Sequence, residues 1–82
     1  MQLSMFPESV HLRCIDPQAN KRRYYCMSVQ PTLFGDWILV KEWGRIGSSS
    51  RIQHEHHATI ATAQKSLDKL ARQKRQRGYE PS

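Results

Sequence analysis

The sequence lacks long apolar runs and contains few cysteines. Its most apolar run, Trp37–Val40, has four residues, far short of the about 20 that a membrane-spanning helix needs. The two cysteines, Cys14 and Cys26, are too few for a disulfide scaffold. We expect both to be free thiols on neighbouring strands, with a cross-strand disulfide as the minor alternative. Residues 1–7 have neither the basic nor the apolar region of a signal peptide. These absences predict a cytoplasmic protein without membrane contact.

Recognisable catalytic motifs are also missing. The sequence contains no G-x-S-x-G, no H-E-x-x-H, no P-loop and no dinucleotide-binding fingerprint. Several of its acidic residues are scattered along the chain instead of being paired: Asp16, Asp36, Glu42 and Glu55. We therefore predict that this chain is not an enzyme and requires no cofactor.

Acidic residues are few, and the chain is basic as a result. Thirteen Lys and Arg residues oppose seven Asp and Glu residues, which gives a net charge of +6. This balance favours a polyanionic partner. Nucleic acid ranks first, and an anionic membrane surface is a low-ranked alternative, so we expect no membrane partner. A nucleoid-associated location is compatible with this charge balance.

A length of 82 residues corresponds to one domain with a small core. We place this domain at residues 9–79, between a flexible lead-in (1–8) and a tail (80–82). We expect a monomer.

The hydrophobic pattern predicts strands followed by one helix. Short alternating or apolar segments separated by turn residues indicate four strands, at 10–15, 22–30, 37–46 and 51–56. The period then changes, and apolar residues recur at a spacing of three and four: Ile60, Ala63, Leu67, Leu70 and Ala71. Thr59 suits the N-cap of this helix and Gly78 its C′ position. The expected fold is α+β, an antiparallel sheet of about four strands with one C-terminal amphipathic helix packed on one face.

Alternation along the third strand divides its side chains between two faces. We assign Ile38, Val40 and Ile46 to the core face because that face is apolar. The opposite face, which carries Leu39 followed by Lys41, Trp43 and Arg45, is then the exposed binding face.

Leu33 and Phe34, in the loop before this strand, are expected to fold back on the sheet. An exposed apolar tip for a partner is the alternative.

A tryptophan between two cations suits a nucleic-acid interface. An indole can stack on a base or pack on a sugar, and an arginine can pair bidentately with a phosphate. We predict that this is a non-catalytic nucleic-acid-binding module with low sequence specificity, and that DNA is its ligand, with RNA as a second possibility. The predicted binding residues are Trp43, Arg45, Lys41, Gly44, Arg51, Arg22 and Arg23. Gly44 enters this set because a residue without a side chain allows close approach to the backbone.

Two other interpretations of Trp43 stay open. It can be a core tryptophan that only anchors the sheet. It can also form, with Arg45, the anchor pair of a protein–protein interaction module, since both residue types are enriched at binding hot spots. The salt dependence of binding distinguishes a protein interface from a nucleic-acid interface. Binding to phosphates weakens steeply as the salt concentration rises, whereas a protein interface centred on Trp43 should depend on salt far less.

A cluster of histidines is the second candidate functional site, as a possible set of metal ligands. His54 and His56 are two residues apart, so on a strand they face the same way and could share a Zn²⁺ ion with His11 or a cysteine. The sequence has no C-x-x-C pair and no zinc-finger spacing. We therefore predict no metal site and place these histidines on an exposed edge strand.

The segment Trp43-Gly44-Arg45-Ile46-Gly47 resembles the motif that names the WGR domain. This domain occurs beside the catalytic part of DNA-damage-responsive poly(ADP-ribose) polymerases and in small bacterial proteins. The likeness extends to other segments: Ile15-Asp16-Pro17, Asn20 to Tyr25, and Arg77-Gly78-Tyr79. It implies a small stand-alone bacterial member that prefers DNA strand ends or nicks. Trp43 would pack against the terminal nucleotide, Arg45 would help to hold that contact, and a separate DNA-processing enzyme could be a partner.

Overall fold

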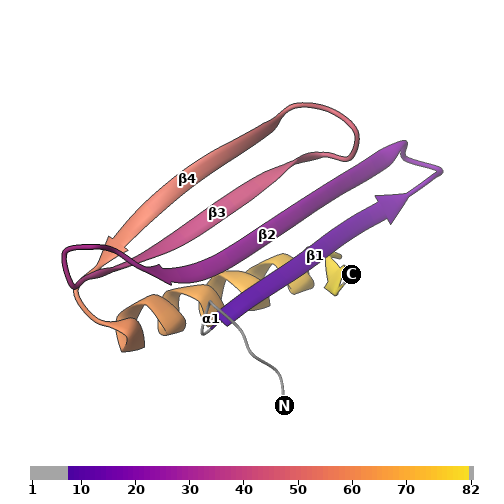
Figure 1. Cartoon of the computed structure of the whole chain (residues 1–82). Helices are drawn as coiled ribbons and strands as arrows, with labels where there is room; N and C mark the ends of the chain where they lie inside the picture. The colour runs from indigo at the N-terminus through magenta and orange to yellow at the C-terminus, as the bar shows by residue number, and fades with distance from the viewer. Residues whose placement is uncertain (1–7, 82) are drawn as a thin grey trace, which may run out of the picture.

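The computed structural model describes residues 8–81, which form a five-stranded sheet and one helix (Figure 1). Residues 1–7 of the predicted lead-in lie outside the described part. The elements in chain order are β1 (Glu8–Asp16), β2 (Lys21–Pro31), β3 (Trp37–Arg45), β4 (Ser50–His57), α1 (Ile60–Gln76) and β5 (Glu80–Pro81). The predicted α+β class, with an antiparallel sheet and a C-terminal helix, is confirmed.

The sheet is antiparallel throughout and has the order β4-β3-β2-β1-β5. Its fifth strand is the element that the sequence pattern did not predict. Residues Glu80–Pro81, placed in the tail by the sequence, pair with Leu12 and Arg13 at the outer edge of β1. Two residues that end in a proline carry no strand pattern, although a proline is tolerated at an edge strand such as this one.

The helix begins and ends at the residues that the sequence indicated. Thr59 has an extended backbone, and its hydroxyl accepts a hydrogen bond from the amide of Thr62. At the other end, Gly78 adopts a positive φ of 99°. The amide of Gly78 donates to the carbonyl of Arg75, and the amide of Tyr79 donates to that of Lys74. These two bonds form a Schellman motif, which turns the chain back toward the sheet.

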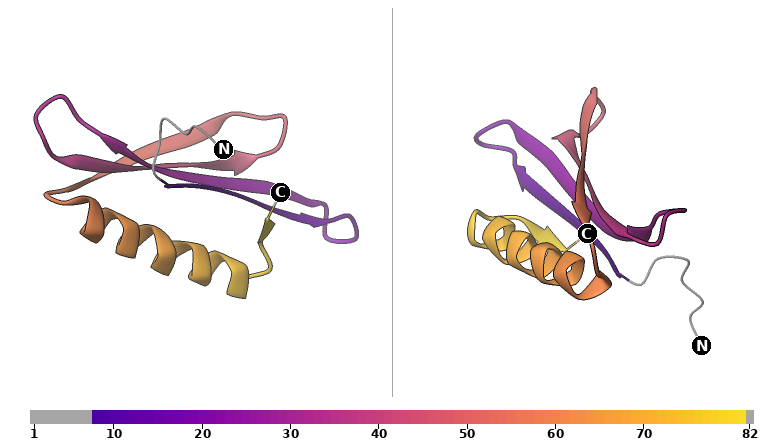
Figure 2. Two further views of the ribbon diagram at one scale, coloured as in Figure 1. Left: turned by 60° about the horizontal axis from the view of Figure 1, so that its bottom comes forward. Right: turned by 90° about the vertical axis from the view of Figure 1, so that its left-hand side faces the viewer.

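The helix covers one face of the sheet and leaves the other face open (Figure 2). The core between them contains Leu12, Tyr25, Met27, Val29, Leu39, Ala63 and Leu67. Leu39 has no exposed surface, so the predicted assignment of the two faces of β3 is wrong. Ile38 and Val40 lie on the open face, and Ile46 lies after β3 with 44% of its surface exposed.

Strand pairing gives the physical reason for this correction. Leu39 is directly opposite Val29, and Trp43 is opposite Tyr25. Ile38 is opposite the polar Gln30 instead. Alternation shows which residues of β3 share a face, but both of its faces carry apolar residues. The large apolar side chains of β2 therefore decide which face the helix covers.

The β2–β3 loop projects an apolar tip into solvent, at the end of the sheet opposite the β1–β2 and β3–β4 loops (Figure 1). Leu33 and Phe34 are 99% and 92% exposed, so the prediction that they fold back is wrong. The loop is closed by its own hydrogen bonds: Thr32 donates its amide to the carbonyl of Asp36 and its hydroxyl to the carboxylate of that residue. The Thr32 hydroxyl also accepts from the amide of Phe34, which directs the tip outward.

The two cysteines lie on neighbouring strands and are both free. Cys14 is buried and is paired in register with Arg23, whereas Cys26 is paired with His11. The register places the two thiols on opposite faces of the sheet, so a disulfide between them is excluded.

The assignment of the faces of β3 can be tested with two neighbouring substitutions. Leu39→Ala should lower the free energy of unfolding by about 2–5 kcal/mol, because it leaves a cavity in the core. Ile38→Ala is the matched control on the open face and should cost about 1 kcal/mol or less. Urea denaturation followed by circular dichroism measures both values. Equal losses, or a larger loss for Ile38→Ala, would contradict the assignment.

Candidate nucleic-acid interface

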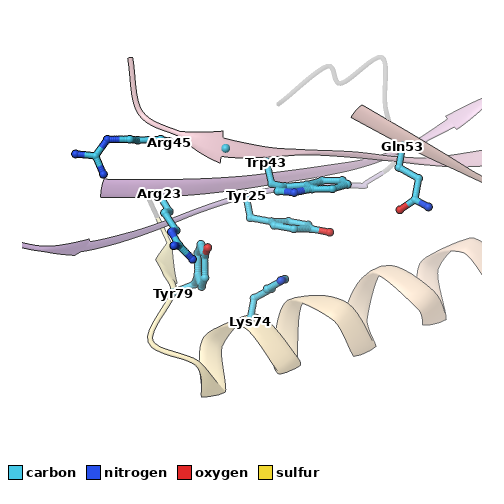
Figure 3. Close-up of a pocket in the computed structure, with 8 residues that line it drawn as sticks. Arg23, Tyr25, Trp43, Arg45, Gln53, Lys74 and Tyr79 are labelled. Atoms are coloured by element: carbon cyan, nitrogen blue, oxygen red, sulfur yellow. The ribbon is translucent and has the colours of Figure 1, made fainter. Parts of the chain in front are cut away.

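The main candidate site is a pocket of about 470 Å³ between the C-terminal half of α1 and the adjoining ends of β2 and β3 (Figure 3). Its lining combines aromatic rings with cations from several elements. The lining residues are Arg23, Tyr25, Trp43, Gly44, Arg45, Gln53, Lys74 and Tyr79. The pocket therefore lies on the helix side of the sheet, where the core ends and solvent begins.

Three aromatic rings form one wall of the pocket. The rings of Tyr25 and Trp43 are stacked, with centroids 5.6 Å apart and planes 11° apart. Tyr79 meets Tyr25 edge-on at 6.4 Å. Burial raises the pKa of the Tyr25 hydroxyl above its usual value. Trp43 is half-buried and packs against the core cluster, so it anchors the sheet and also borders the pocket.

Lys74 brings a cation to the aromatic wall from α1. Its Nζ atom lies 4.5 Å from the ring centroid of Tyr25 and 5.8 Å from that of Tyr79, within the range of cation–π attraction. Partial burial, and then the nearby charge of Arg77, lower the pKa of Lys74 from its usual value. The Schellman motif at the helix end fixes Lys74 and Tyr79 relative to each other, because it joins their backbones.

Arg23 and Arg45 bring two further positive charges to the open end of the pocket. They are direct partners across β2 and β3, an arrangement that is unfavourable for like charges. In Figure 3 the Arg45 side chain extends away from Arg23. Its guanidinium donates to the backbone carbonyl of Asn20 at 3.0 Å and to the side-chain oxygen of Asn20 at 3.2 Å. An anion between the two arginines would relieve their repulsion.

Asn20 is held in position by the β1–β2 turn. It adopts a left-handed conformation with φ of 51°, which asparagine tolerates better than most residues. Its amide donates to the carbonyl of Pro17, and Asp16 accepts hydrogen bonds from the amides of Gln18 and Ala19. The turn thus has a fixed shape that positions both acceptors of the Arg45 guanidinium.

Comparison with known proteins identifies the family. The WGR domain matches residues 8–82. The chain belongs to the WGR family. It is 41% identical over 75 residues to an uncharacterized protein, y4dW, of Sinorhizobium fredii (strain NBRC 101917 / NGR234). That match covers 92% of this chain and 37% of the relative, so the chain spans little more than a third of the relative's length. No solved structure matches the chain.

The WGR domain is a binding domain, and it is a nucleic-acid-binding module in poly(ADP-ribose) polymerase-like proteins. The three consecutive residues Trp43, Gly44 and Arg45 of the motif all line the pocket. A Cβ atom on Gly44 would lie 2.9 Å from the carbonyl oxygen of Ser49. The close approach at this glycine is therefore made by the chain that enters β4. Within residues 8–81, no helix is long and apolar enough to cross a membrane.

The other predicted cations are distributed over the WGR domain. Arg23 lines the pocket, whereas its neighbour Arg22 lies on the opposite face of the sheet, in register with Ile15. Arg51 is exposed on β4, directly opposite Trp43. Lys41 shares a face with Trp43, but its side chain is only 14% exposed and pairs with Glu55 at 3.3 Å. The structure thus brings Arg23 and Arg45 to the pocket and ties Lys41 to another group.

Sequence reasoning missed four of the lining residues: Tyr25, Gln53, Lys74 and Tyr79. Tyr25 belongs to the predicted second strand and to the segment Asn20 to Tyr25 of the family likeness, but only its cross-strand register with Trp43 makes it part of the same wall. Lys74 is one of the basic residues in the last turn of α1, where cations commonly offset the helix dipole, so the sequence carries no separate signal for it. The one signal for Tyr79 in the sequence is the family likeness of the segment Arg77-Gly78-Tyr79.

The histidine cluster lies away from the pocket. His54 and His56 are paired in register with Val40 and Ile38, which places them on the open face. The ring of His56 lies 3.8 Å from the carboxylate of Asp36. Among the residues that the structure describes, no group of three or more His, Cys, Asp or Glu side chains could hold a metal ion.

Glu55 connects the sheet to the helix beside the site. Its carboxylate accepts hydrogen bonds from Ser66 on α1, from His57 and from Lys41. These donors favour the ionised form, with Ser66 the largest contribution, and lower the pKa of Glu55 to about 2. The network holds α1 against β3 and β4 and keeps Lys41 in place.

The Glu55 network predicts a specific dependence of stability on pH. Because the pKa of Glu55 is lowered on folding from 4.5 to about 2, its ionised form stabilises the fold above pH 4.5. This contribution should disappear as the pH falls from 4.5 toward 2. Glu55→Gln should therefore show a smaller loss of Tm than the wild type over that range. Thermal melts at several pH values measure the difference.

Ser66→Ala serves as the graded control for this experiment. It keeps the carboxylate and removes the strongest of its three donors, so its pH dependence should fall between those of the wild type and Glu55→Gln. Identical acid profiles for the wild type and Glu55→Gln would show that Glu55 does not carry this pH dependence.

Proposed function

We propose that this WGR domain binds DNA without catalysing a reaction, with little sequence preference and with a preference for strand ends or nicks. The observation that carries the proposal is one pocket in which a Trp43–Tyr25 stack lies beside three cations from three elements: Arg23 from β2, Arg45 from β3 and Lys74 from α1. This combination of π-faces and positive charge is typical of sites that bind the unpaired nucleotides of single-stranded nucleic acid. The family membership of the chain supports the same ligand class.

The geometry supports a mechanism in which a nucleotide at a strand end enters the pocket. The pocket volume of about 470 Å³ lies within the range of sites for small ligands, so it suits one terminal nucleotide better than the middle of a duplex. The exposed part of Trp43 would contact the base or sugar, which contributes about 1–3 kcal/mol. Arg45 would exchange its contacts with Asn20 for a bidentate contact with a phosphate, and Arg23 would then face the same anion.

A module of this kind acts by locating its ligand for another protein or domain. The relative is considerably longer than this chain, and we propose that a separate DNA-processing enzyme uses such a module to recognise DNA. The proposed location is accordingly the cytoplasm, at the nucleoid.

Fluorescence anisotropy with labelled duplexes, one nicked with a 5′-phosphate and one covalently closed, tests the proposal. The wild type should bind the nicked duplex more tightly, and its affinity should fall steeply with salt. Arg45→Gln should weaken binding to the nicked duplex and reduce the log–log salt slope by about 0.9 for each lost phosphate contact. Arg13→Gln is the matched control, because Arg13 is exposed on the open face, and it should leave both quantities close to wild type.

Two results would contradict the proposal. If Arg45→Gln and Arg13→Gln behave alike, the pocket is not the site. If the wild type binds no nucleic acid at low salt despite its net charge of +6, a protein–protein interaction module becomes the better account. An RNA strand included in the titration determines whether the ligand is DNA or RNA.

A further inference from the structure

The outer face of α1 carries a row of cations that is separate from the pocket. Lys65, Lys69 and Arg72 are all exposed. Their spacing of four and three residues places them on one side of the helix. The buried residues of α1, Ala63 and Leu67, lie on the opposite side, against the sheet. We call Lys65, Lys69 and Arg72 the outer cation row.

The fold itself does not account for the outer cation row. None of its three residues has an ion-pair partner within 4 Å in the described part of the chain, 8–81. Lys65 and Lys69 precede the last turn of α1, which is where cations offset the helix dipole. Like charges at spacings of three and four each destabilise a helix by about 0.2–0.5 kcal/mol. The only acid in α1 is Asp68, so the row retains an excess of positive charge.

We propose that the outer cation row is a second nucleic-acid contact, which binds the phosphate backbone of duplex DNA away from its ends. Lys65 and Arg72 are seven positions apart on the helix, which corresponds to a rise of about 10 Å. Successive phosphates of one DNA strand are about 3.4 Å apart along the axis, so the row can reach two or three consecutive phosphates. Contacts of this kind involve no base edges and are independent of sequence.

The outer cation row and the pocket face different directions. Lys74 extends from α1 toward the aromatic rings under the sheet (Figure 3), whereas the outer cation row lies on the side of α1 turned away from the sheet. One molecule can therefore hold a strand end in the pocket and a continuous stretch of duplex on its helix. This inference takes its ligand, DNA, from the proposed function. The residues that carry it lie on a different surface from the pocket.

The test uses a covalently closed circular duplex, which has no ends, and the triple variant K65Q/K69Q/R72Q. This variant should lose about tenfold or more in affinity for the circle, and its salt slope should fall by about 2–3 because each lost phosphate contact contributes about 0.9. Its preference for nicked over closed DNA should persist. The charge-preserving variant K65R/K69R/R72K should bind the circle like the wild type.

The control variant S9E/Q30E/H54E makes the same change in net charge on the open face. Ser9, Gln30 and His54 are all in strands and are not cross-strand partners of one another. This control should bind the circle at least several-fold more tightly than K65Q/K69Q/R72Q. Circular dichroism verifies folding, and if the triple variant is unfolded the double variant K65Q/K69Q replaces it, with an expected slope change of about 2.

The inference is overturned if K65Q/K69Q/R72Q binds the circle as the wild type does, or if the control loses as much affinity. It is also overturned if the wild type binds nicked duplex but not the circle, a result that would leave the proposed function intact. Failure of the wild type to bind either DNA would overturn both. The two proposals therefore fail in distinguishable ways.

Discussion

The packing of α1 against one face of the sheet is the constraint on which the rest of the structure depends. In a chain of 82 residues the core is small, and within the described residues 8–81 its central cluster contains seven buried residues from β1, β2, β3 and α1. One helix can cover only one face of the sheet. The face that receives the helix becomes the interior, and the other face remains open to solvent. Which side chains of β2 and β3 face the interior and which face the open side follows from which face the helix covers.

The same packing creates the pocket at the edge of the core. Tyr25 belongs to the core cluster, and Trp43 stacks on it from β3. Beyond this pair the strands continue to Arg23 and Arg45, both of which are exposed. Along each strand, the change from a buried or half-buried aromatic ring to an exposed arginine takes place within two residues. A site that contains both a π-surface and positive charge results from this boundary, and its geometry depends on the integrity of the core.

The lysines of this protein lie in different surroundings, and these surroundings decide which of them can contact an anionic ligand. The net charge of +6 does not show this difference. Lys41 is tied to Glu55 and is mostly buried, so it contributes little free positive charge. Lys74 is held over the aromatic rings. Lys65 and Lys69 lie on the outer side of α1 with no acid within ion-pair distance in the described residues. Composition alone would count these four lysines as equivalent.

Part of the candidate site could be predicted from the sequence because it is local. Trp43, Gly44 and Arg45 are consecutive, and a strand with turn residues on both sides places the first and third on one face. Arg22 and Arg23 show where this kind of reasoning ends. They are adjacent and chemically identical, yet only Arg23 lines the pocket, because neighbouring residues of a strand point to opposite faces. The choice between them required the register with Arg45.

The sequence by itself determined the elements of this protein: the four longer strands, the helix from its Thr59 cap to Gly78, the α+β class and the position of the Trp-Gly-Arg motif. These features depend on periodicity and on backbone preferences within a few residues, so they can be recognised locally. Only the tertiary structure decided which face of the sheet is buried, that Lys41 is paired, and that Tyr25, Lys74 and Tyr79 meet Trp43 at one pocket. Those outcomes depend on contacts between residues far apart in the chain, which strand register and helix packing bring together and which no local pattern specifies.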